Sequence, residues 1–239
     1  MTSKTSGKPA TRGGGPAGKQ GSREVNRLRG RRSGNRGWII AWALLAVIAV
    51  GGLYLVYATS TGGHDAGTAS AASGYRHVSG EPGAGDVAPP FTLPSSTGGQ
   101  ISLSDYRGQS VLLYFHGGLM CQPCLDQITD LEQNQAALRE AGIDKVLSIS
   151  HDPIDLLAQK AADMGLSTPL LSDPNLAVSR TYTTTQYGMM GGSANGHSFI
   201  LVGPDGTITW RADYGGAPDY TMYLPTEGML ADLAAERTR

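Results

Sequence analysis

Two cysteines, Cys121 and Cys124, are the only ones among the 239 residues of this chain. They lie two residues apart, directly after an apolar run at residues 111–116 and before a segment with helical periodicity. This order predicts that Cys121 begins a helix, where unpaired backbone N–H groups and the helix dipole favour a reactive thiolate. Cys124, one turn later, would then lie within reach to close a disulfide. The pair is therefore a candidate for reversible two-electron exchange.

Two other interpretations of the pair are open. A permanent bridge is one, but a bridge that closes so short a loop constrains the unfolded chain very little. A structural zinc site is the other, but it normally takes four ligands, and the chain has no second cysteine pair. Pro123, between the cysteines, suits the first turn of a helix because that position needs no N–H donor.

Three further residues are candidates for supporting roles. His116 ends the apolar run and could tune the thiolates, carry a proton, or simply bind backbone. Gly196 and His197 end a glycine-rich stretch at residues 188–197, which we expect to be mobile and to leave room for a partner's backbone. Asp152, before Pro153, is expected to cap the following helix.

The elements that position these residues alternate along residues 86–239. Apolar runs and turn residues predict a strand pair around Gly98 and Gly99, strands at 111–116, 145–150 and 168–173, and a hairpin about residues 204–206. Helices are expected at 124–140, 153–164 and 225–236, with a short one at 173–182 that Asp173 caps. The pattern predicts an α/β fold with a mixed sheet covered by helices on both faces.

The part before residue 86 has a different composition. Residues 1–36 hold ten of the nineteen Lys and Arg against one acid, and residues 38–57 hold no charge. As a helix, that apolar run would span about 30 Å. We therefore expect a disordered basic cytoplasmic arm at 1–36, a transmembrane helix at 37–57 and a flexible linker at 58–85, with the folded domain at 86–239 outside the cytoplasm. A cleaved signal peptide is the alternative.

Residues 85–239 resemble the thioredoxin-fold redoxins of the peroxiredoxin (AhpC/TSA) group. The matching stretches, in order, are APPFTLPSSTGGQISLSDYRGQSVLLYFH, CQPC, SISHDP, LLSDPNLAVSRTY and FILVGPDGTITWR. The chain is also similar to membrane-tethered thiol–disulfide oxidoreductases of the TlpA and ResA kind, which combine an N-terminal anchor with a CxxC pair. Both resemblances imply a thioredoxin-like, peroxiredoxin-type mixed sheet flanked by helices.

The peroxiredoxin resemblance implies particular residue roles. Cys124 takes the place of the cysteine that attacks peroxide, and Cys121 replaces the threonine that hydrogen-bonds it. Gly117 stands where the group has a proline, and Gly196 where it has an arginine. A thiol peroxidase built on this chain would thus lack donors that activate peroxide. In thioredoxin-like proteins the position of Gly196 is a cis-proline that faces the CxxC pair.

A third resemblance is to copper-delivery proteins of the SCO type, which place a histidine before a late strand as His197 and Ser198 do here. It implies a copper site at Cys121, Cys124 and His197, although SCO proteins separate their cysteines by three residues.

The sequence alone thus favours a membrane-anchored extracytoplasmic thiol–disulfide oxidoreductase with Cys121 and Cys124 as its redox pair. A peroxiredoxin-like thiol peroxidase and a copper-binding protein are the alternatives. Expected partners are protein thiols and disulfides outside the cytoplasm and the membrane at residues 38–57, with hydrogen peroxide or copper in the alternatives. We expect no organic cofactor and no nucleic acid.

Overall fold

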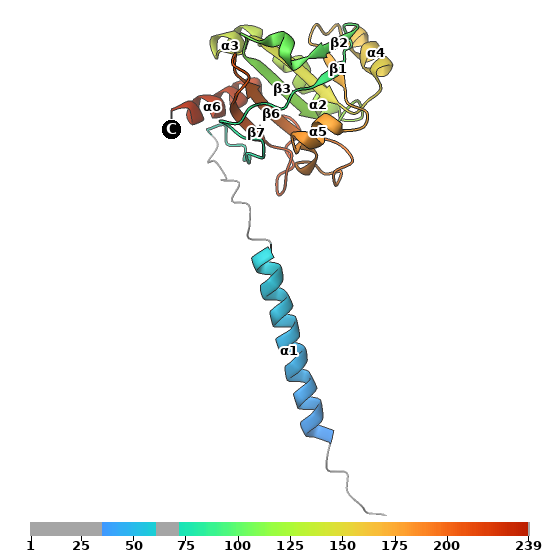
Figure 1. The fold of residues 1–239 in the computed structure, drawn as a ribbon, viewed down its shortest axis with the longest axis vertical. Coiled ribbons are helices and arrows are strands. Elements are labelled where there is room, and N and C mark those ends of the chain that lie inside the picture. Colours follow the sequence, from blue (N-terminus) through green and yellow to red (C-terminus); the bar gives the residue numbers. More distant parts are fainter. Residues whose placement is uncertain (1–34, 61–71, 239) are drawn as a thin grey trace, which may run out of the picture. The chain divides into compact units, whose positions relative to one another are not determined.

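The structure, a computed structural model, describes residues 35–60 and 72–238. Its contacts divide the chain into two units, residues 1–63 and 64–239. Helix α1 (Asn35–Ser60) belongs to the first unit (Figure 1). Within the described residues, no helix is both long and apolar enough to cross a membrane. The transmembrane helix expected at residues 37–57 is therefore not supported. Residues 1–34 of the expected arm and 61–71 of the expected linker lie outside the described residues.

The second unit is built on a five-stranded sheet in the order β5-β4-β3-β6-β7. Strands β3, β4 and β5 run parallel, whereas β6 is antiparallel to β3 and β7 is antiparallel to β6 (Figure 1). The strand bounds are Val111–His116 (β3), Lys145–Ser150 (β4), Leu170–Ser172 (β5), His197–Val202 (β6) and Ile208–Asp213 (β7). The predicted thioredoxin-like mixed sheet is thus confirmed.

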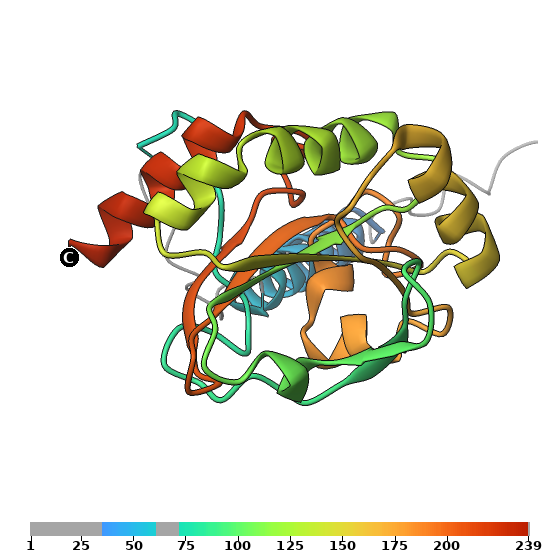
Figure 2. The same ribbon diagram turned by 90° about the horizontal axis from the view of Figure 1, so that it is seen from above.

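Helices and loops cover both faces of this sheet (Figure 2). One face carries α2 (Gln122–Gln133), α3 (Gln135–Glu140), α4 (Ile154–Met164) and α6 (Thr226–Arg237). The other carries α5 (Ala177–Thr181), the hairpin of β1 (Thr92–Pro94) and β2 (Gln100–Ser102), and the short helix η1 (Leu103–Tyr106). Side chains alternate between the two layers: Leu112 and Tyr114 of β3 face the α2 layer, and Leu113 and Phe115 face the opposite one.

Three helix boundaries differ from the sequence prediction. The helix expected at 124–140 is two helices that divide at Asn134, whose side chain donates to the backbone oxygen of Asp130 (2.8 Å). Asp152 does not cap α4, whose N-cap residue is Pro153. The short helix α5 begins at Ala177 with Leu176 as its N-cap residue rather than the predicted Asp173, although the carboxylate of Asp173 accepts the backbone N–H of Ala177 (2.9 Å).

Residues 72–85, expected to be linker, pack against the sheet. The backbone of Val78 exchanges two hydrogen bonds with Asp213 at the edge strand β7 (3.1 and 2.7 Å). His77 is buried, and its Nε2 lies 2.8 Å from Oε1 of Glu236. An edge strand offers unpaired backbone groups, and this segment satisfies part of them. The folded part therefore begins before residue 86.

Candidate functional site

The cysteine pair lies at the start of α2 and forms a disulfide, with 2.05 Å between the two Sγ atoms. Cys121 is the N-cap residue, and its carbonyl accepts the backbone N–H groups of Cys124 (3.0 Å) and Leu125 (3.2 Å). Pro123 lies in the first turn, as predicted. Cys121 is partly exposed, whereas Cys124 is fully buried on the side of α2 that packs on the sheet. A partner thiol therefore reaches Cys121 more easily.

His116 holds the turn that leads from β3 to the cysteines. Its Nδ1 accepts the backbone N–H of Gly118 (3.1 Å), so the neutral ring carries its proton on Nε2, which donates to Oγ of Ser148 (2.8 Å). Burial lowers the pKa of His116 to about 4, an effect that Asp152 opposes and His151 reinforces. His116 is thus neutral at pH 7 and acts as a brace rather than as a charged neighbour of the sulfurs.

Asp152 braces the same turn from the end of β4. Its Oδ2 accepts the backbone N–H of Leu119 (3.0 Å) and the hydroxyl of Ser150 (2.8 Å). Gly118 has a φ of +90°, and a Cβ there would overlap this carboxylate, so only glycine fits. Sequence reasoning assigned Asp152 to a helix cap and missed this role. The available signal was its place at the carboxyl end of a parallel strand next to β3.

His197 lies directly opposite His116 on the paired strands β3 and β6. It is fully buried against aromatic rings, with centroid distances of 5.1 Å to Tyr114 and 5.0 Å to Phe199. Among the described residues, neither of its ring nitrogens has a hydrogen-bond partner, and neither has the Tyr114 hydroxyl. Burial, and then the neighbouring His116, lowers the pKa of His197 to about 3.

Gly196 offers no room for a partner's backbone, contrary to the expectation. A Cβ at Gly196 would overlap the carbonyl oxygen of Tyr187, and one at Gly215 would meet the same oxygen. A Cβ at Gly188 would lie 2.8 Å from the Cα of Gly196. Three backbone segments thus approach too closely for any side chain, and the protein's own chain occupies the space beside His197.

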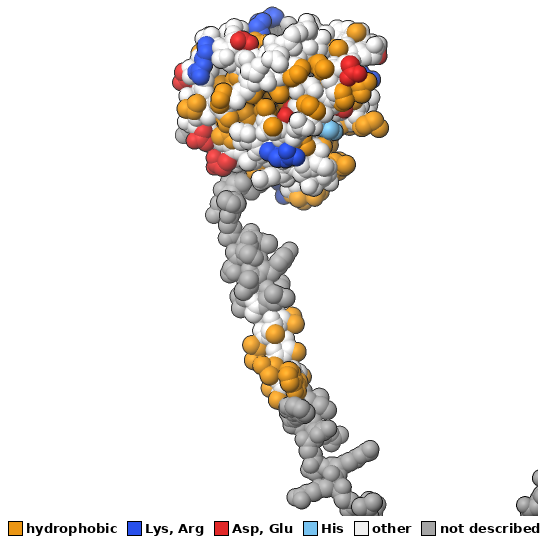
Figure 3. Space-filling view, turned by 45° about the vertical axis from the view of Figure 1, so that its right-hand side comes forward, with side chains coloured by type: hydrophobic (Ala, Val, Ile, Leu, Met, Phe, Trp, Pro, Cys, Tyr) orange, Lys and Arg blue, Asp and Glu red, His pale blue; other side chains and the backbone are white. Residues whose placement is uncertain are grey.

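The accessible cysteine has an apolar neighbour on the surface. On the face shown in Figure 3, hydrophobic side chains gather between scattered charged ones. Met120, which precedes Cys121, is 96% exposed, and Met189 and Met190 of the glycine-rich stretch are exposed as well.

The copper set is not assembled in the described part of the chain. No group of three or more His, Cys, Asp or Glu residues there could hold a metal ion. The sulfurs of Cys121 and Cys124 are bonded to each other, so neither is available as a thiolate ligand in this state.

Comparison with known proteins identifies the family. The model of the AhpC/TSA family matches residues 84–211, which is more than half of the chain. The chain belongs to the AhpC/TSA family. A putative peroxiredoxin of Mycobacterium tuberculosis is 38% identical over 129 residues, which cover 52% of this chain and 80% of that protein. Peroxiredoxin Bcp of Escherichia coli is 43% identical over 90 residues, covering 38% of this chain and 57% of that protein.

Solved structures of AhpC/TSA proteins share the fold. Peroxidoxin BcpB of Mycobacterium tuberculosis has a TM-score of 0.53 at 22% identity and covers 64% of this chain and 97% of its own. AhpC of Enterococcus faecalis has a TM-score of 0.54 at 18% identity, with 65% and 92% covered. At sequence identities this low, the similarity to these structures shows the fold alone.

These comparisons correct the main functional prediction. The prediction of a membrane-anchored thiol–disulfide oxidoreductase as the main function was wrong, because the matched relatives are named peroxiredoxins and the described residues contain no helix able to span a membrane. The predicted place in the peroxiredoxin group is confirmed, and the AhpC/TSA chain is a thiol-dependent oxidoreductase. Its location outside the cytoplasm stays a prediction.

Proposed function

We propose that this protein is a thiol peroxidase of the peroxiredoxin kind, in which Cys124 reduces a hydroperoxide and Cys121 closes the disulfide. The observation that carries this proposal is the bonded cysteine pair at the start of α2 in a chain of the AhpC/TSA family. The resemblance to that family implies that Cys124 takes the place of the cysteine that attacks peroxide. The bonded pair corresponds to the product of one turnover.

The first step consumes the peroxide. The Cys124 thiolate attacks one peroxide oxygen, the O–O bond breaks, and the sulfur is oxidised to a sulfenic acid. The other oxygen takes a proton and leaves as water or an alcohol. Since Cys124 is fully buried in the disulfide form, the reduced form must open enough for peroxide to enter.

The second step produces the bond seen in the structure. The Cys121 thiolate attacks the sulfenic sulfur, the S–O bond breaks, and water leaves as the S–S bond forms. A dithiol protein then attacks the more accessible Cys121, and its second thiol releases the pair in reduced form while the partner becomes a disulfide. The exposed Met120 supplies apolar surface for that partner beside Cys121.

The site departs from the family at three positions, and the structure explains one of them. No arginine can stand at Gly196, because the carbonyl of Tyr187 fills the space where its Cβ would be. Gly117 and Cys121 replace a proline and a threonine. Few donors remain at the start of α2, because Pro123 has no N–H and those of Cys124 and Leu125 donate to the carbonyl of Cys121, so activation of the peroxide requires a rearrangement of this turn in the reduced form.

The test separates the two cysteines in single-turnover reactions of the reduced protein with hydrogen peroxide. Cys121→Ser should accumulate sulfenic acid at Cys124, detected by a dimedone adduct and mass spectrometry, and should form no intramolecular disulfide. Cys124→Ser should form no sulfenic acid and consume no peroxide. The wild type should react much faster than free cysteine.

The matched control is Ser198→Ala, which keeps both thiols and removes a buried hydroxyl of β6. It should leave the sulfenic acid on the same cysteine. A wild-type rate no better than that of free cysteine, or adducts at Cys121 in the Cys124→Ser variant, would refute the proposal.

A further inference from the structure

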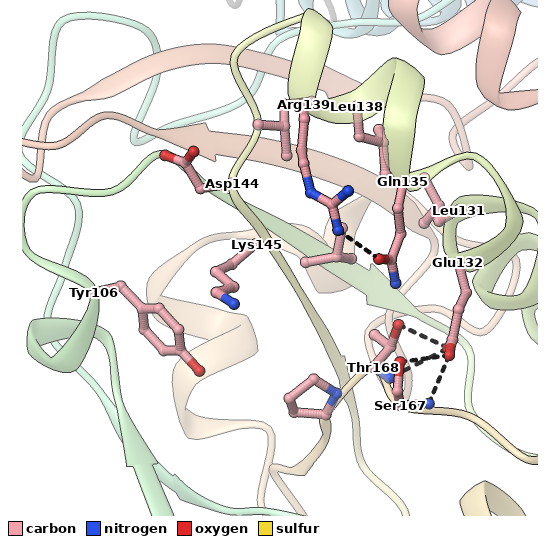
Figure 4. A pocket seen from close by; sticks show the side chains of 13 residues that line it. Tyr106, Leu131, Glu132, Gln135, Leu138, Arg139, Asp144, Lys145, Ser167 and Thr168 are labelled. Atoms are coloured by element: carbon pink, nitrogen blue, oxygen red, sulfur yellow. Dashed lines mark hydrogen bonds between the residues drawn. The ribbon is translucent and has the colours of Figure 1, made fainter.

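A pocket of about 420 Å³ lies at the opposite end of the central strands from the cysteine pair. The cysteines follow the carboxyl end of β3, whereas the pocket includes Lys145, at the amino end of the parallel neighbour β4. The ends of α2 and α3, residues 143–146 and the loop at 167–169 surround it (Figure 4). No step of the proposed peroxidase cycle uses this pocket.

The inner wall of the pocket is apolar. Leu131, Leu138 and Ile143 form its base but are almost completely buried, so they offer a ligand little surface. The partly exposed Val146, Pro169 and Tyr106 supply the accessible apolar surface. This wall suits the hydrocarbon part of a small molecule.

Two cations on the pocket have no carboxylate partner. Arg139 and Lys145 point toward the same hollow as Tyr106 (Figure 4). Arg139 donates one N–H to Oε1 of Gln135 (3.0 Å), which leaves most of its donors for a ligand. Within the described residues, neither Arg139 nor Lys145 forms an ion pair.

The two acids of the pocket bind other parts of the chain. The carboxylate of Glu132 accepts four hydrogen bonds from the backbone and hydroxyl groups of Ser167 and Thr168, at 2.6 to 3.2 Å. Burial raises the pKa of Glu132, but these hydrogen bonds outweigh it and the pKa is lowered. Asp144 accepts the backbone N–H of Ser110 (2.7 Å). Arg139 and Lys145 therefore remain the donors for a ligand.

We propose that this pocket binds a small organic anion, whose carboxylate or phosphate lies between Arg139 and Lys145 and whose apolar body lies against Val146, Pro169 and the ring of Tyr106. A guanidinium matches the planar fork of a carboxylate or phosphate, and a lysine adds a point charge.

The test compares three ligands with the same chain length, hexanoate, hexyl phosphate and hexan-1-ol, by saturation-transfer NMR on the full chain. Both anions should bind, and hexan-1-ol should bind at least ~10-fold more weakly because it cannot form charge-assisted hydrogen bonds. The relative affinity of the two anions shows whether the site prefers a carboxylate or a phosphate.

Variants locate the site. Arg139→Gln and Lys145→Gln should each weaken binding of the anions at least ~5-fold. Lys160→Gln, on α4 and outside the pocket, should change nothing. Unchanged affinity in the Arg139→Gln/Lys145→Gln double variant, binding of hexan-1-ol as tight as that of the anions, or no binding of either anion would overturn the proposal. A Cys121→Ser/Cys124→Ser chain should still bind, so failure of the peroxidase proposal leaves this one standing.

Discussion

His116 and His197 lie side by side in a layer of aromatic rings, yet their surroundings differ. His116 satisfies both ring nitrogens with Gly118 and Ser148. Neither ring nitrogen of His197 has a hydrogen-bond partner among the described residues. A buried polar group without a hydrogen-bond partner destabilises a fold, so the burial of His197 lowers the stability of the folded protein.

The low pKa of His197 predicts a stability that depends on pH. In the unfolded chain the imidazole takes up a proton below pH 6.5, whereas in the folded protein its pKa is about 3. As far as His197 is concerned, the free energy of unfolding is therefore highest above pH 6.5 and decreases as the pH falls from 6.5 toward 3. Between pH 7.5 and pH 5 this one residue should cost on the order of 2 kcal/mol in the free energy of unfolding.

His197→Phe should remove that part of the pH dependence, as measured by urea unfolding at pH 7.5 and 5. The groups that face His197 are Tyr114, His116, Phe199 and Tyr214. The variant keeps all of them, and a packing cost common to both pH values cancels in the difference. An identical pH dependence in the variant and the wild type would contradict the neutral, buried state of His197.

Gly196→Ala should destabilise the protein strongly. Its Cβ would overlap the backbone of Tyr187, which cannot move aside as a flexible side chain could. We expect a loss of about 3 kcal/mol in urea unfolding, at the upper end of overpacking effects. Gly83→Ala is the matched control, because its Cβ would meet its nearest neighbour at 3.4 Å, and it should change stability by less than about 0.5 kcal/mol. Equal losses in the two variants would count against the close backbone packing.

The turn between β3 and α2 is the element on which the redox pair depends. It contains Gly117 and Gly118, whose freedom would leave Cys121 poorly placed without the braces from His116 and Asp152. Both braces come from the carboxyl ends of parallel strands. The carboxyl ends of β3 and β4, rather than α2 itself, therefore set the position of the first cysteine.

His116→Phe tests this element. The phenyl ring keeps the stacking on Tyr114 but cannot accept the N–H of Gly118. Closure of the disulfide after sulfenic acid formation should slow roughly 10-fold, because Cys121 is held less well for attack. Stopped-flow tryptophan fluorescence and acid quenching measure the two steps separately.

Ser148→Ala is the matched control, since it removes the partner of Nε2 and leaves the bond to Gly118 in place. It should slow closure less than His116→Phe does. An unchanged rate of closure in His116→Phe would show that the turn holds its geometry without this brace.

At the scale of the whole molecule, residues 72–85 belong to the folded part. Besides the backbone pairing of Val78, the N–H of Gly80 donates to Asp213 (2.9 Å), and Arg211 donates to the carbonyl of Pro82 (2.9 Å). Arg211 and Asp213 form a buried ion pair (2.8 Å), which this segment completes.

A chain that begins at residue 86 should therefore be less stable than one that begins at residue 72. The four hydrogen bonds of Val78, Gly80 and Pro82 alone are worth about 4 kcal/mol together, and their loss in the shorter chain also exposes part of the buried ion pair. Urea unfolding of the two chains measures the difference. Equal stability would mean that the segment contributes nothing to the fold.

The sequence predicted what depends on local patterns. The bounds of β3 and β4, the turn at 204–206 and the helix start at Cys121 follow from apolar runs, turn residues and a proline. Contacts between distant segments were not predictable in this way. Asp152 binds a turn 33 residues away in the sequence, and the space beside Gly196 is filled by Tyr187, which no periodicity indicates.

The burial of Cys124 beneath its bonded partner also bears on irreversible damage. A cysteine sulfenic acid that meets a second peroxide becomes a sulfinic acid, which thiols do not restore. Once the bond to Cys121 has closed, Cys124 is fully enclosed, and a second oxidant has no path to it. Under the proposed cycle, inactivation by excess peroxide is thus confined to the interval before closure, and the rate at which Cys121 attacks would determine how much peroxide the protein survives.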